Sequence, residues 1–368
     1  MDIIFIGQFV SREESLKDLN YSQAANSYQI TFLKLIKPKL VISIIPIFIN
    51  KHYQFSFPIE IINFINNPVK GNSFRHKLLR LYKDTKQTLN IVSASKIRNV
   101  WFYNITITNV FIFLYIFFLT KKKTYVLVAD YSFSKTNLIN VLLNYSIRKS
   151  NGVIVWNSNI KHKNRVVVPN VLDSSKIKLN QSKVINPVII FSGSLGKTTG
   201  FEFALEFFSK YKNYELIITG MPYHYSDREF DDLIEKYVQP NENINFYGLV
   251  NLERYHELLN SADIALSLRD AENKEHNGNF PSKILEYLSF GKFVVSTRKY
   301  NDIDSELYFY SKSNFKSFNE VLQTLLELKP QSVLDKRAFI YDNLLKNHTE
   351  KRLITAMRTL IDKNSTNN

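Results

Sequence analysis

Short apolar runs alternate with helical patterns along almost the whole chain, and this alternation limits the folds that the chain can adopt. In the first half the runs include DIIFIG at 2–7, YVLVAD at 125–130 and RVVVPN at 165–170, with helical patterns at 22–36 and 137–149. Uninterrupted β-branched runs are typical of strands that are buried on both faces, in a parallel sheet covered by helices. We therefore predict an α/β fold.

The alternation is interrupted once. Residues 172–186, LDSSKIKLNQSKVIN, lose the apolar density and have the composition of a linker, and the pattern resumes with PVIIFSGS at 187–194. Each half is thus expected to form a doubly wound, Rossmann-like domain whose strands bind ligands at their carboxyl ends. We predict a first domain over 1–180, a second over 181–345, and a C-terminal helix and tail over 346–368 that pack towards the first domain.

Composition narrows the chemistry that the chain can perform. The 368 residues include no cysteine, which excludes disulfides, thiolate metal sites and cysteine nucleophiles. The seven histidines show no spacing typical of metal ligands, so we expect no metal. The N-terminal segment lacks the basic region of a cleavable signal, and we expect it to form a first buried strand.

The formal net charge of +15 indicates an anionic partner. We find no zinc finger, aromatic RNA-binding signature or base-reading helix, which argues against nucleic acid. The run VFIFLYIFFL at 110–119 is too short to span a bilayer, but TKKKT follows it, and together they favour an anionic membrane surface. We expect a cytoplasmic protein attached peripherally to the inner face of the cell membrane. A scattered excess of solvated lysines is the alternative.

A glycine-rich segment, FSGSLGKTTGF at 191–201, separates a predicted strand ending at residue 192 from a predicted helix. Gly193, Gly196 and Gly200 would let a phosphate approach the backbone, and the start of the helix offers unpaired N–H groups and the positive end of its dipole. Lys197 would add a positive charge. An ordinary turn between a strand and a helix is the alternative.

The segment FPSKILEYLSFGKFVVST at 280–297 predicts a helix that begins at Pro281 and ends at Gly291, followed by a strand. At 100° per residue, Ser282, Lys283 and Glu286 share one side of this helix. The opposite side is a buried stripe of Ile284, Leu285 and Leu288. A carboxylate such as Glu286 can accept hydrogen bonds from a sugar diol, with Lys283 near phosphates. A solvated lysine–glutamate pair at i,i+3 is the alternative.

This segment, together with four others, resembles the donor-binding half of retaining glycosyltransferases with the GT-B fold, particularly glycosyltransferase family 4 of the polysaccharide-assembly type. The other motifs are VVPNVLD at 167–173, FSGSLGKTTGF at 191–201, INFYGLV at 244–250 and YHELLNSADIALSLR at 255–269. The resemblance covers about residues 165–300. It implies two Rossmann-like domains that face a central cleft, the first binding the acceptor and the second a nucleotide-sugar.

The resemblance also assigns roles to single residues. Glu286 matches the second glutamate of the family's Glu, seven residues, Glu motif, which binds the donor ribose, whereas the first glutamate falls at Gly278. The family's diphosphate-binding arginine and lysine would fall near Ser194 and Thr199, so neither is present. The catalytic candidates are Asp130, which would contact or deprotonate the acceptor hydroxyl, and Lys197 and Arg269, which with Lys283 would offset the charge of the leaving diphosphate. The donor-binding candidates are Gly7, Gly193, Ser194, Lys197, Tyr247, Val250, Ser282, Lys283 and Glu286.

The activity implied is transfer of a hexose, with retention, from a UDP-sugar or a similar donor to a hydroxyl of a glycan or a polyprenyl-diphosphate-linked oligosaccharide in surface polysaccharide biosynthesis. No cofactor and no metal are expected, and DID at 302–304 is interpreted as a turn instead of a metal-binding Asp-x-Asp motif. The missing chemistry at Gly278, Ser194 and Thr199 leaves one alternative. It is a catalytically inactive homologue that acts as a partner or chaperone of an active glycosyltransferase.

Overall fold

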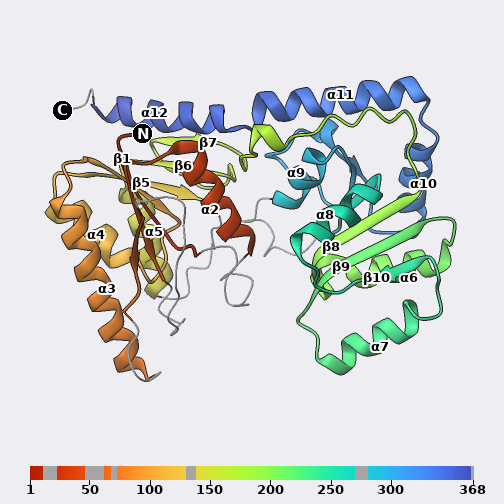
Figure 1. Ribbon diagram of the computed structural model, residues 1–368, viewed down its shortest axis with the longest axis horizontal. Coiled ribbons are helices and arrows are strands. Elements are labelled where there is room, and N and C mark those ends of the chain that lie inside the picture. Colours follow the sequence, from red (N-terminus) through yellow and green to blue (C-terminus); the bar gives the residue numbers. More distant parts are fainter. Residues whose placement is uncertain (11–22, 46–61, 68–72, 130–137, 270–280, 366–368) are drawn as a thin grey trace. The chain divides into compact units, whose positions relative to one another are not determined.

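The computed structural model describes residues 1–10, 23–45, 62–67, 73–129, 138–269 and 281–365 (Figure 1). The chain divides into two compact units: unit 1 comprises residues 1–169 and 350–368, and unit 2 comprises residues 170–349. Each unit contains its own parallel sheet with helices packed on it. The predicted α/β architecture of two Rossmann-like domains is therefore confirmed.

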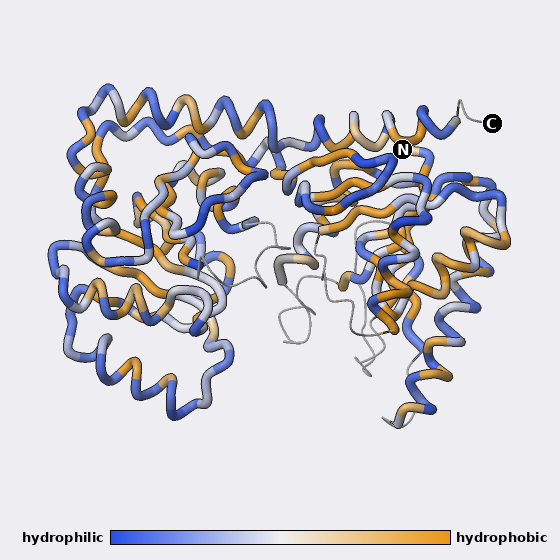
Figure 2. The backbone as a smooth tube through the Cα atoms, turned by 180° about the vertical axis from the view of Figure 1, so that it is seen from behind, coloured by the Kyte–Doolittle hydropathy of each residue, from blue (hydrophilic) through white to orange (hydrophobic). Residues whose placement is uncertain are grey.

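Unit 1 has a seven-stranded sheet in the order β3-β2-β1-β4-β5-β6-β7, and all neighbouring strands are parallel. The strands are β1 (Ile3–Gly7), β2 (Leu40–Ile44), β3 (Ile62–Ile65), β4 (Asn99–Tyr103), β5 (Lys123–Val128), β6 (Gly152–Val155) and β7 (Arg165–Val167). The helices are α2 (Gln23–Ile36), α3 (Phe74–Ala94), α4 (Val110–Leu119), α5 (Leu138–Lys149) and α12 (Glu350–Ser365). Figure 2 shows that α4 is among the hydrophobic stretches of this unit.

Alternate residues along the unit 1 strands point to opposite faces of the sheet, and both faces are covered. Ile4, Phe102 and Val126 belong to a core cluster that also includes side chains of α3, α4 and α5. On the other face, Phe5 stacks on Phe32 of α2 with ring centroids 4.7 Å apart, and α12 contacts both α2 and β6. Helices α3, α4 and α5 thus form one layer, and α2 and α12 form the other, as right-handed crossovers require.

Unit 2 has a six-stranded parallel sheet in the order β10-β9-β8-β11-β12-β13. The strands are β8 (Val188–Gly196), β9 (Glu215–Tyr223), β10 (Ile244–Phe246), β11 (Ile264–Ser267), β12 (Phe293–Ser296) and β13 (Phe309–Tyr310). The α-helices are α6 (Phe201–Lys210), α7 (Asp227–Tyr237), α8 (Leu252–Ser261), α9 (Ser282–Ser289), α10 (Phe315–Leu326) and α11 (Pro330–Asn347). Three 3-10 turns are η1 (Ser174–Lys176), η2 (Lys197–Thr199) and η4 (Ser305–Leu307).

The strand before the glycine-rich segment is longer than predicted. We expected it to end at residue 192, but β8 continues to Gly196 and pairs with β9 along nine residues of each strand. The two backbones meet closely at Gly193 and Gly220, because a Cβ atom on Gly220 would lie 1.8 Å from the Gly193 carbonyl oxygen. Both glycines have positive φ angles, 120° and 147°. The glycines here permit close pairing of strands, and they do not start a turn at Gly193.

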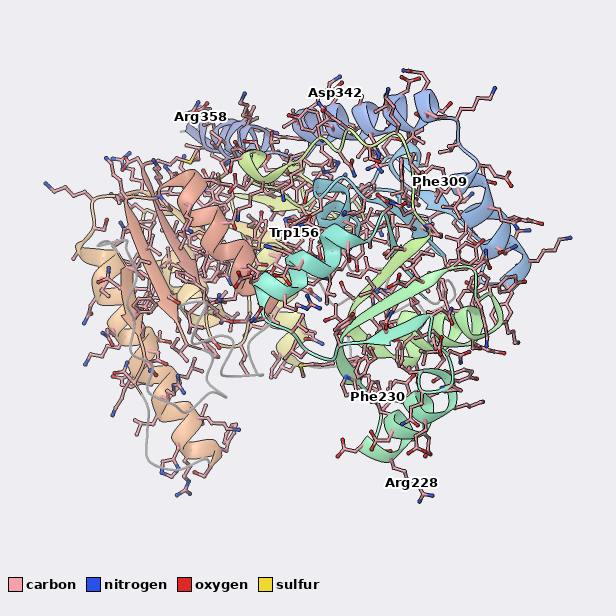
Figure 3. All side chains as sticks on the ribbon, turned by 45° about the vertical axis from the view of Figure 1, so that its right-hand side comes forward. Trp156, Arg228, Phe230, Phe309, Asp342 and Arg358 are labelled. Atoms are coloured by element: carbon pink, nitrogen blue, oxygen red, sulfur yellow. The ribbon has the colours of Figure 1, made fainter. Side chains whose placement is uncertain are left out.

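Aromatic side chains hold the helices of unit 2 on the sheet. Phe230 of α7, which is labelled in Figure 3, stacks on Phe201 of α6 with ring centroids 5.7 Å apart. Phe207 of α6 meets Phe318 of α10 edge-on at 4.8 Å. Aromatic pairs of this geometry contribute roughly 0.5–1.5 kcal/mol beyond the burial of their area.

None of the helices that the structure describes in either unit is long and apolar enough to cross a bilayer.

A buried ion pair fastens α11 to the sheet of unit 2. The Arg337 Nη2 atom lies 3.2 Å from Asp263 Oδ1, and the two side chains are 2% and 11% exposed. The other oxygen of Asp263 accepts hydrogen bonds from the backbone and side-chain nitrogens of Asn186 at 2.9 and 2.8 Å. Arg337 also donates to the Gly291 carbonyl oxygen at 2.7 Å, so this guanidinium joins α11 to the end of α9.

We predict that Asp263→Ala lowers the free energy of unfolding by about 3–5 kcal/mol, because it leaves the Arg337 charge buried and unpaired. Urea denaturation measures this loss. The matched control is Glu206→Ala, which breaks the exposed Lys210–Glu206 pair of the same unit and should change stability by less than about 1 kcal/mol. Equal losses in the two variants would show that the buried pair does not fasten α11.

Candidate active site

Helix α9 forms where the sequence predicts it, and it presents the predicted polar side chains. The Pro281 carbonyl accepts a hydrogen bond from the Ile284 N–H at 3.0 Å, and the helix ends before Gly291, whose φ is 70°. Ile284, Leu285 and Leu288 are buried as predicted. Ser282, Lys283 and Glu286 are partly exposed on the other side. Tyr287, which the helical pattern did not identify as buried, is fully buried as well.

The ammonium group of Lys283 is the centre of a polar cluster that joins three elements. It lies 3.0 Å from Glu286 Oε2, 3.2 Å from the Tyr255 hydroxyl of α8 and 3.3 Å from Ser192 Oγ of β8. The Lys283 and Glu286 side chains are each 37% exposed, so both can reach a ligand. The cluster brings the predicted pair on α9 to the start of the glycine-rich segment, within β8.

Two tyrosines surround Lys283 with aromatic rings and hydroxyl groups. Its Nζ atom lies 4.9 Å from the Tyr255 ring centroid and 5.6 Å from that of Tyr287, within the range of cation–π attraction. The Tyr287 hydroxyl lies 2.8 Å from Ser192 Oγ. Sequence reasoning missed Ser192, Tyr255 and Tyr287. A signal for Tyr287 existed, since it is the residue after Glu286 and lies at i+3 from the buried Ile284.

The cluster combines a charged lysine with neutral phenols. Burial, the largest single effect, would lower the pKa of Lys283, but the Glu286 carboxylate together with Tyr255 and Tyr287 raises that pKa well above its usual value. Burial raises the pKa of Tyr255 and of Tyr287 above the usual range. At neutral pH the site therefore offers one positive charge, two hydroxyl groups that can donate hydrogen bonds, and the Glu286 carboxylate as an acceptor.

Gly193 lies directly beside the lysine. A Cβ atom built on it would lie 3.6 Å from Lys283 Cε, and its φ of 120° disfavours any other residue. The exposed Ser194 follows it. The predicted residues Gly193, Ser194, Ser282, Lys283 and Glu286 thus come together in unit 2. A group that binds there meets backbone, hydroxyl groups and an ammonium group at once.

Lys197 is engaged elsewhere in the structure. Its Nζ atom lies 3.0 Å from Glu229 Oε1 of α7 and 5.4 Å from the Tyr225 ring centroid. Hydrogen bonds from Ser226, and to a smaller extent from Lys197, lower the pKa of Glu229 to about 2. Thr199 is buried and closes η2, because its hydroxyl bonds both the N–H and the carbonyl of Gly196. A catalytic role of Lys197 stays a prediction.

The remaining predicted residues of unit 2 follow strands of the same sheet. Arg269 lies just after β11, and its backbone N–H and carbonyl both bond the Thr297 hydroxyl at 2.9 Å. The Tyr247 ring is 40% exposed and lies 5.4 Å from the Arg254 guanidinium. The Gly248 carbonyl accepts the Gly220 N–H at 2.9 Å, which fixes the loop that carries Tyr247 and Val250 next to β9.

In unit 1, Gly7 has a packing reason of its own. A Cβ atom on Gly7 would lie 2.4 Å from Gln29 Oε1, and Gln29 bonds both the N–H and the carbonyl of Gln8 at 2.9 and 2.8 Å. The donor-binding role of Gly7 is not tested by this contact. The predicted acceptor residue Asp130 and the position Gly278 both lie outside the described residues.

Of the two acidic residues of DID at 302–304, Asp304 has a structural role. The Asp304 carboxylate accepts the Glu306 N–H at 3.0 Å and caps η4, and its second oxygen accepts from Asn343 at 3.2 Å. Such a capped turn agrees with the interpretation of this motif as a turn. Within the ranges that the structure describes, no group of three or more His, Asp or Glu side chains is arranged to hold a metal ion.

The C-terminal end of α9 is fastened on several sides, which fixes the direction of the helix. The Ser289 carbonyl accepts the Lys178 N–H at 2.9 Å, and the Gly291 carbonyl accepts from Arg337. Lys292 is 4% exposed, and its ammonium donates to the Ala262 and Asn260 carbonyls at 2.7 and 3.1 Å. Burial lowers the pKa of Lys292 to about 8, although Asp263 opposes this shift.

Residues 175–307 match the family model described as Glycosyl transferases group 1, which covers a little over a third of the chain and lies within unit 2. The matched segment contains β8, α8 and α9, and therefore every side chain of the Lys283 cluster. The family match supports a glycosyltransferase. A comparison with curated proteins gave no significant match.

Solved structures share the fold of nearly the whole chain. Sucrose-phosphate synthase from Thermosynechococcus elongatus has a TM-score of 0.69 at 11% identity, covering 99% of this chain and 100% of its own. The N-terminal domain of trehalose-6-phosphate phosphatase from Candida albicans has a TM-score of 0.67 at 13% identity, covering 98% and 96%. Anabaena HepE in complex with UDP and glucose has a TM-score of 0.66 at 14% identity, covering 99% of each chain. These likenesses show the GT-B fold.

Lys292 makes the stability of unit 2 depend on pH. Since its pKa is about 8 in the folded state and 10.5 in an unfolded chain, the unfolded state binds more protons at this residue between these pH values. The quantity to follow is the difference in the free energy of unfolding between the wild type and Lys292→Met. We predict that this difference, wild type minus variant, rises by about 3 kcal/mol from pH 7.5 to 10.5. Urea titrations over this range measure it, with Lys316→Met on the surface of α10 as the matched control. A difference that stays constant or falls would contradict the prediction.

Proposed function

We propose that the chain is a retaining glycosyltransferase of the family 4 type, which transfers a sugar from a UDP-sugar to a hydroxyl of a glycan or of a lipid-linked oligosaccharide. The observation that carries the proposal is the Lys283–Glu286 pair on α9, held by Tyr255 and Ser192 beside the backbone of Gly193. A carboxylate and an ammonium 3.0 Å apart, each 37% exposed, suit a ligand that carries both a diol and a diphosphate.

In the proposed donor complex, Glu286 accepts hydrogen bonds from the ribose hydroxyls. Lys283 lies next to the diphosphate, and its charge offsets the charge that develops as the diphosphate leaves. The neutral phenols of Tyr255 and Tyr287 and the hydroxyl of Ser192 hold this ammonium in place. Gly193 allows the diphosphate to approach the backbone closely. Tyr247 and Val250 lie on the loop that we propose meets the base, and Arg269 and Lys197 are further candidates for charge stabilisation.

The proposed reaction breaks the bond between the anomeric carbon and the donor diphosphate and forms a bond from that carbon to the acceptor oxygen. With retention, the acceptor attacks on the face that the diphosphate leaves, and its proton passes to a donor phosphate oxygen. The protein then contributes positioning and charge stabilisation, without a covalent nucleophile. Two of the structures with a similar fold agree with the proposed donor class, since one is a sucrose-phosphate synthase and the other is a complex with UDP and glucose.

We propose that unit 1 provides the acceptor site, with Gly7 and Asp130 as its candidates, in the synthesis of surface polysaccharide at the inner face of the cell membrane. In this proposal the chain reaches a lipid-linked acceptor by attachment to the membrane surface. The high net charge of the chain supports an anionic surface.

One observation favours the second candidate, a catalytically inactive homologue that assists an active glycosyltransferase. The end of β8 and η2 have Ser194 and Thr199 where the family has cations, Thr199 is buried in η2, and Lys197 pairs with Glu229. Slow release of the sugar from the UDP-sugar in the absence of acceptor separates the two. We expect the wild type to release the sugar slowly. Lys283→Met should lower the rate of release at least roughly tenfold, because one charge-assisted interaction is lost. No release at all, together with normal UDP binding, would favour the inactive homologue.

Glu286→Ala tests the donor site directly. We predict that it weakens UDP binding by roughly ten- to a hundredfold, because it removes hydrogen bonds to a charged acceptor. The free energy of unfolding should change by less than about 1 kcal/mol, since the pair with Lys283 is partly exposed. Calorimetric titration with UDP measures the first effect and urea denaturation the second.

The matched control is Glu257→Ala, which removes the acidic partner of another i,i+3 pair, that of Arg254 and Glu257 on α8. It should leave UDP binding within about twofold of the wild type. If Glu286→Ala bound UDP as the wild type does, the assignment of the ribose ligand would be wrong.

A further inference from the structure

The positive charge of the chain resides almost entirely in unit 1. Residues 1–169 and 350–368 contain 27 Lys and Arg against 9 Asp and Glu, whereas residues 170–349 contain 21 against 24. The net charge of +15 therefore does not serve the diphosphate site of unit 2, which relies on single, placed cations such as Lys283. Because the charges are spread over the unit, they suit an extended anionic partner of unit 1.

Helices α4 and α5 expose apolar side chains on the face that points away from the sheet. On α4, Val110, Ile112, Phe113 and Ile116 are buried against the core. The outward residues of α4 are Phe111, Tyr115, Phe118 and Leu119, which are 46%, 42%, 59% and 69% exposed, and those of α5 are Val141 and Tyr145, at 52% and 40%. The two helices are neighbours in one layer, so these side chains form one patch. We call these six residues the α4–α5 patch.

Helix α4 carries more apolar side chains than its packing against the core requires. Every residue of α4 is apolar or aromatic, although only one side of the helix packs against the core. A helix that is apolar all round lies within a protein core or in contact with lipid. Exposed contiguous apolar surface of this kind marks an interaction site.

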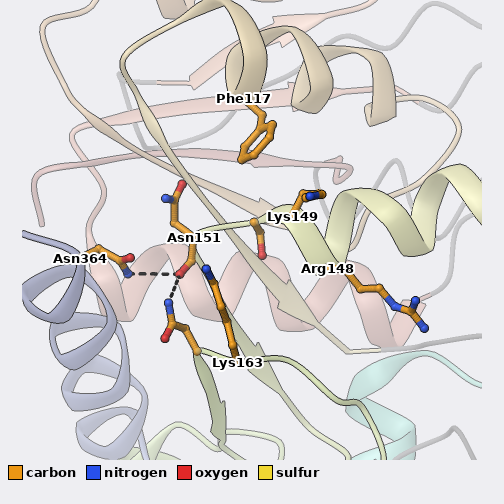
Figure 4. A pocket seen from close by; sticks show the side chains of 8 residues that line it. Phe117, Arg148, Lys149, Asn151, Lys163 and Asn364 are labelled. Atoms are coloured by element: carbon orange, nitrogen blue, oxygen red, sulfur yellow. Dashed lines mark hydrogen bonds between the residues drawn. The ribbon is translucent and has the colours of Figure 1, made fainter. Parts of the chain in front are cut away.

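Cations collect where α4 and α5 end. Arg148 and Lys149 in the last turn of α5, with Lys163 and Phe117, line a pocket of about 580 Å³ (Figure 4). Within the pocket lining, the Asn151 carbonyl accepts hydrogen bonds from the side-chain amides of Asn164 and Asn364 at 3.0 and 3.2 Å, so this carbonyl is satisfied within the protein. The cations at its rim are exposed to solvent. A cationic pocket beside an apolar patch matches a phospholipid, whose phosphate lies beside its acyl chains.

The TKKKT segment contributes less than the sequence indicated. The Lys122 ammonium donates to the Ser95 and Ile97 carbonyls at 2.6 and 2.7 Å, and burial lowers its pKa. Lys123 donates to the Asn364 carbonyl, so it is engaged too. Of this segment, Lys121 alone is fully exposed. The cations that face outwards near the patch are therefore Lys121, Arg148, Lys149 and Lys163.

We propose that unit 1 docks on an anionic phospholipid surface through the α4–α5 patch, with Phe118, Leu119 and Tyr145 inserted among the lipids and Arg148, Lys149 and Lys163 bound to lipid phosphates. This proposal deepens the membrane location given above, because it names the surface. The charge distribution argues against a second copy of the chain as the occupant, since two units of such positive charge would repel each other. Between Thr85 and Leu172 the sequence has twelve Lys and Arg and one acidic residue, Asp130, which fits an anionic surface.

Co-sedimentation with vesicles tests the proposal on the full chain. Vesicles of phosphatidylcholine with roughly 30 mol% phosphatidylglycerol should bind the protein, and vesicles of phosphatidylcholine alone should not. Arg148→Ser with Lys149→Ser should weaken binding to the anionic vesicles roughly 25-fold at low salt, from about fivefold for each charge. Phe118→Ser with Leu119→Ser should weaken it at least roughly tenfold, and this loss should persist at high salt, where charge effects are screened.

The matched control is Lys351→Ser with Arg358→Ser, which removes two exposed charges of the same unit from α12 in the other helix layer (Figure 3). It should weaken binding less than threefold, because the charges lie away from the patch. If it weakened binding as much as the α5 pair does, or if neither patch variant lost binding, the proposed surface would be wrong. Binding of a short duplex DNA in place of vesicles, lost in the same variants, would also overturn it.

The donor site provides an independent check. All of these variants should bind UDP as the wild type does and should unfold within about 1 kcal/mol of it, since the substituted residues are exposed. Vesicle binding without UDP binding would sustain the docking surface and refute the proposed donor site. UDP binding without vesicle binding would do the reverse.

Discussion

The close approach of two backbones, at Gly193 of β8 and Gly220 of β9, organises the candidate site. With a side chain at Gly220 the strands could not pair beyond this point, because the Gly193 carbonyl occupies the space of a Cβ atom. The two strands pair as far as Gly196, and η2 begins at the next residue. This pairing also holds Ser192 and Gly193 beside α9. The Gly220 N–H bonds the Gly248 carbonyl, which fixes the loop with Tyr247. One contact between glycines thus places three of the segments that would bind a donor.

The local part of the site could be predicted from the sequence, and the non-local part could not. The stripe of Ile284, Leu285 and Leu288 and the opposite side with Lys283 and Glu286 follow from helical periodicity alone. Ser192 and Tyr255 join the cluster from β8 and α8, so no spacing in the sequence brings them to Lys283. Likewise, the glycine-rich segment identified Lys197 as a candidate cation near a phosphate, but Glu229 is 32 residues away and their ion pair depends on how α7 packs.

The strand end at residue 192 was misplaced for a related physical reason. Glycine permits both a turn and a close contact between strands, and a sequence does not distinguish them without knowledge of the partner strand. Similarly, the lysines of TKKKT have the composition of a solvated basic segment, yet Lys122 and Lys123 bond backbone carbonyls that only the folded chain places near them. The α/β architecture was predictable because it depends on the repeated pattern of many residues instead of on single contacts.

The two units use positive charge in different ways, and this difference follows from the ligands that we propose. A diphosphate is small, so one ammonium at a fixed position, with neutral phenols around it, can neutralise it without raising the net charge of unit 2. A membrane is an extended surface whose charge is not fixed in position, so many exposed lysines and arginines act together on it and no single one is essential. A near-neutral unit 2 and a strongly basic unit 1 are therefore what we expect of a protein that acts as we propose, with a soluble donor bound at a specific site and an acceptor reached at a surface.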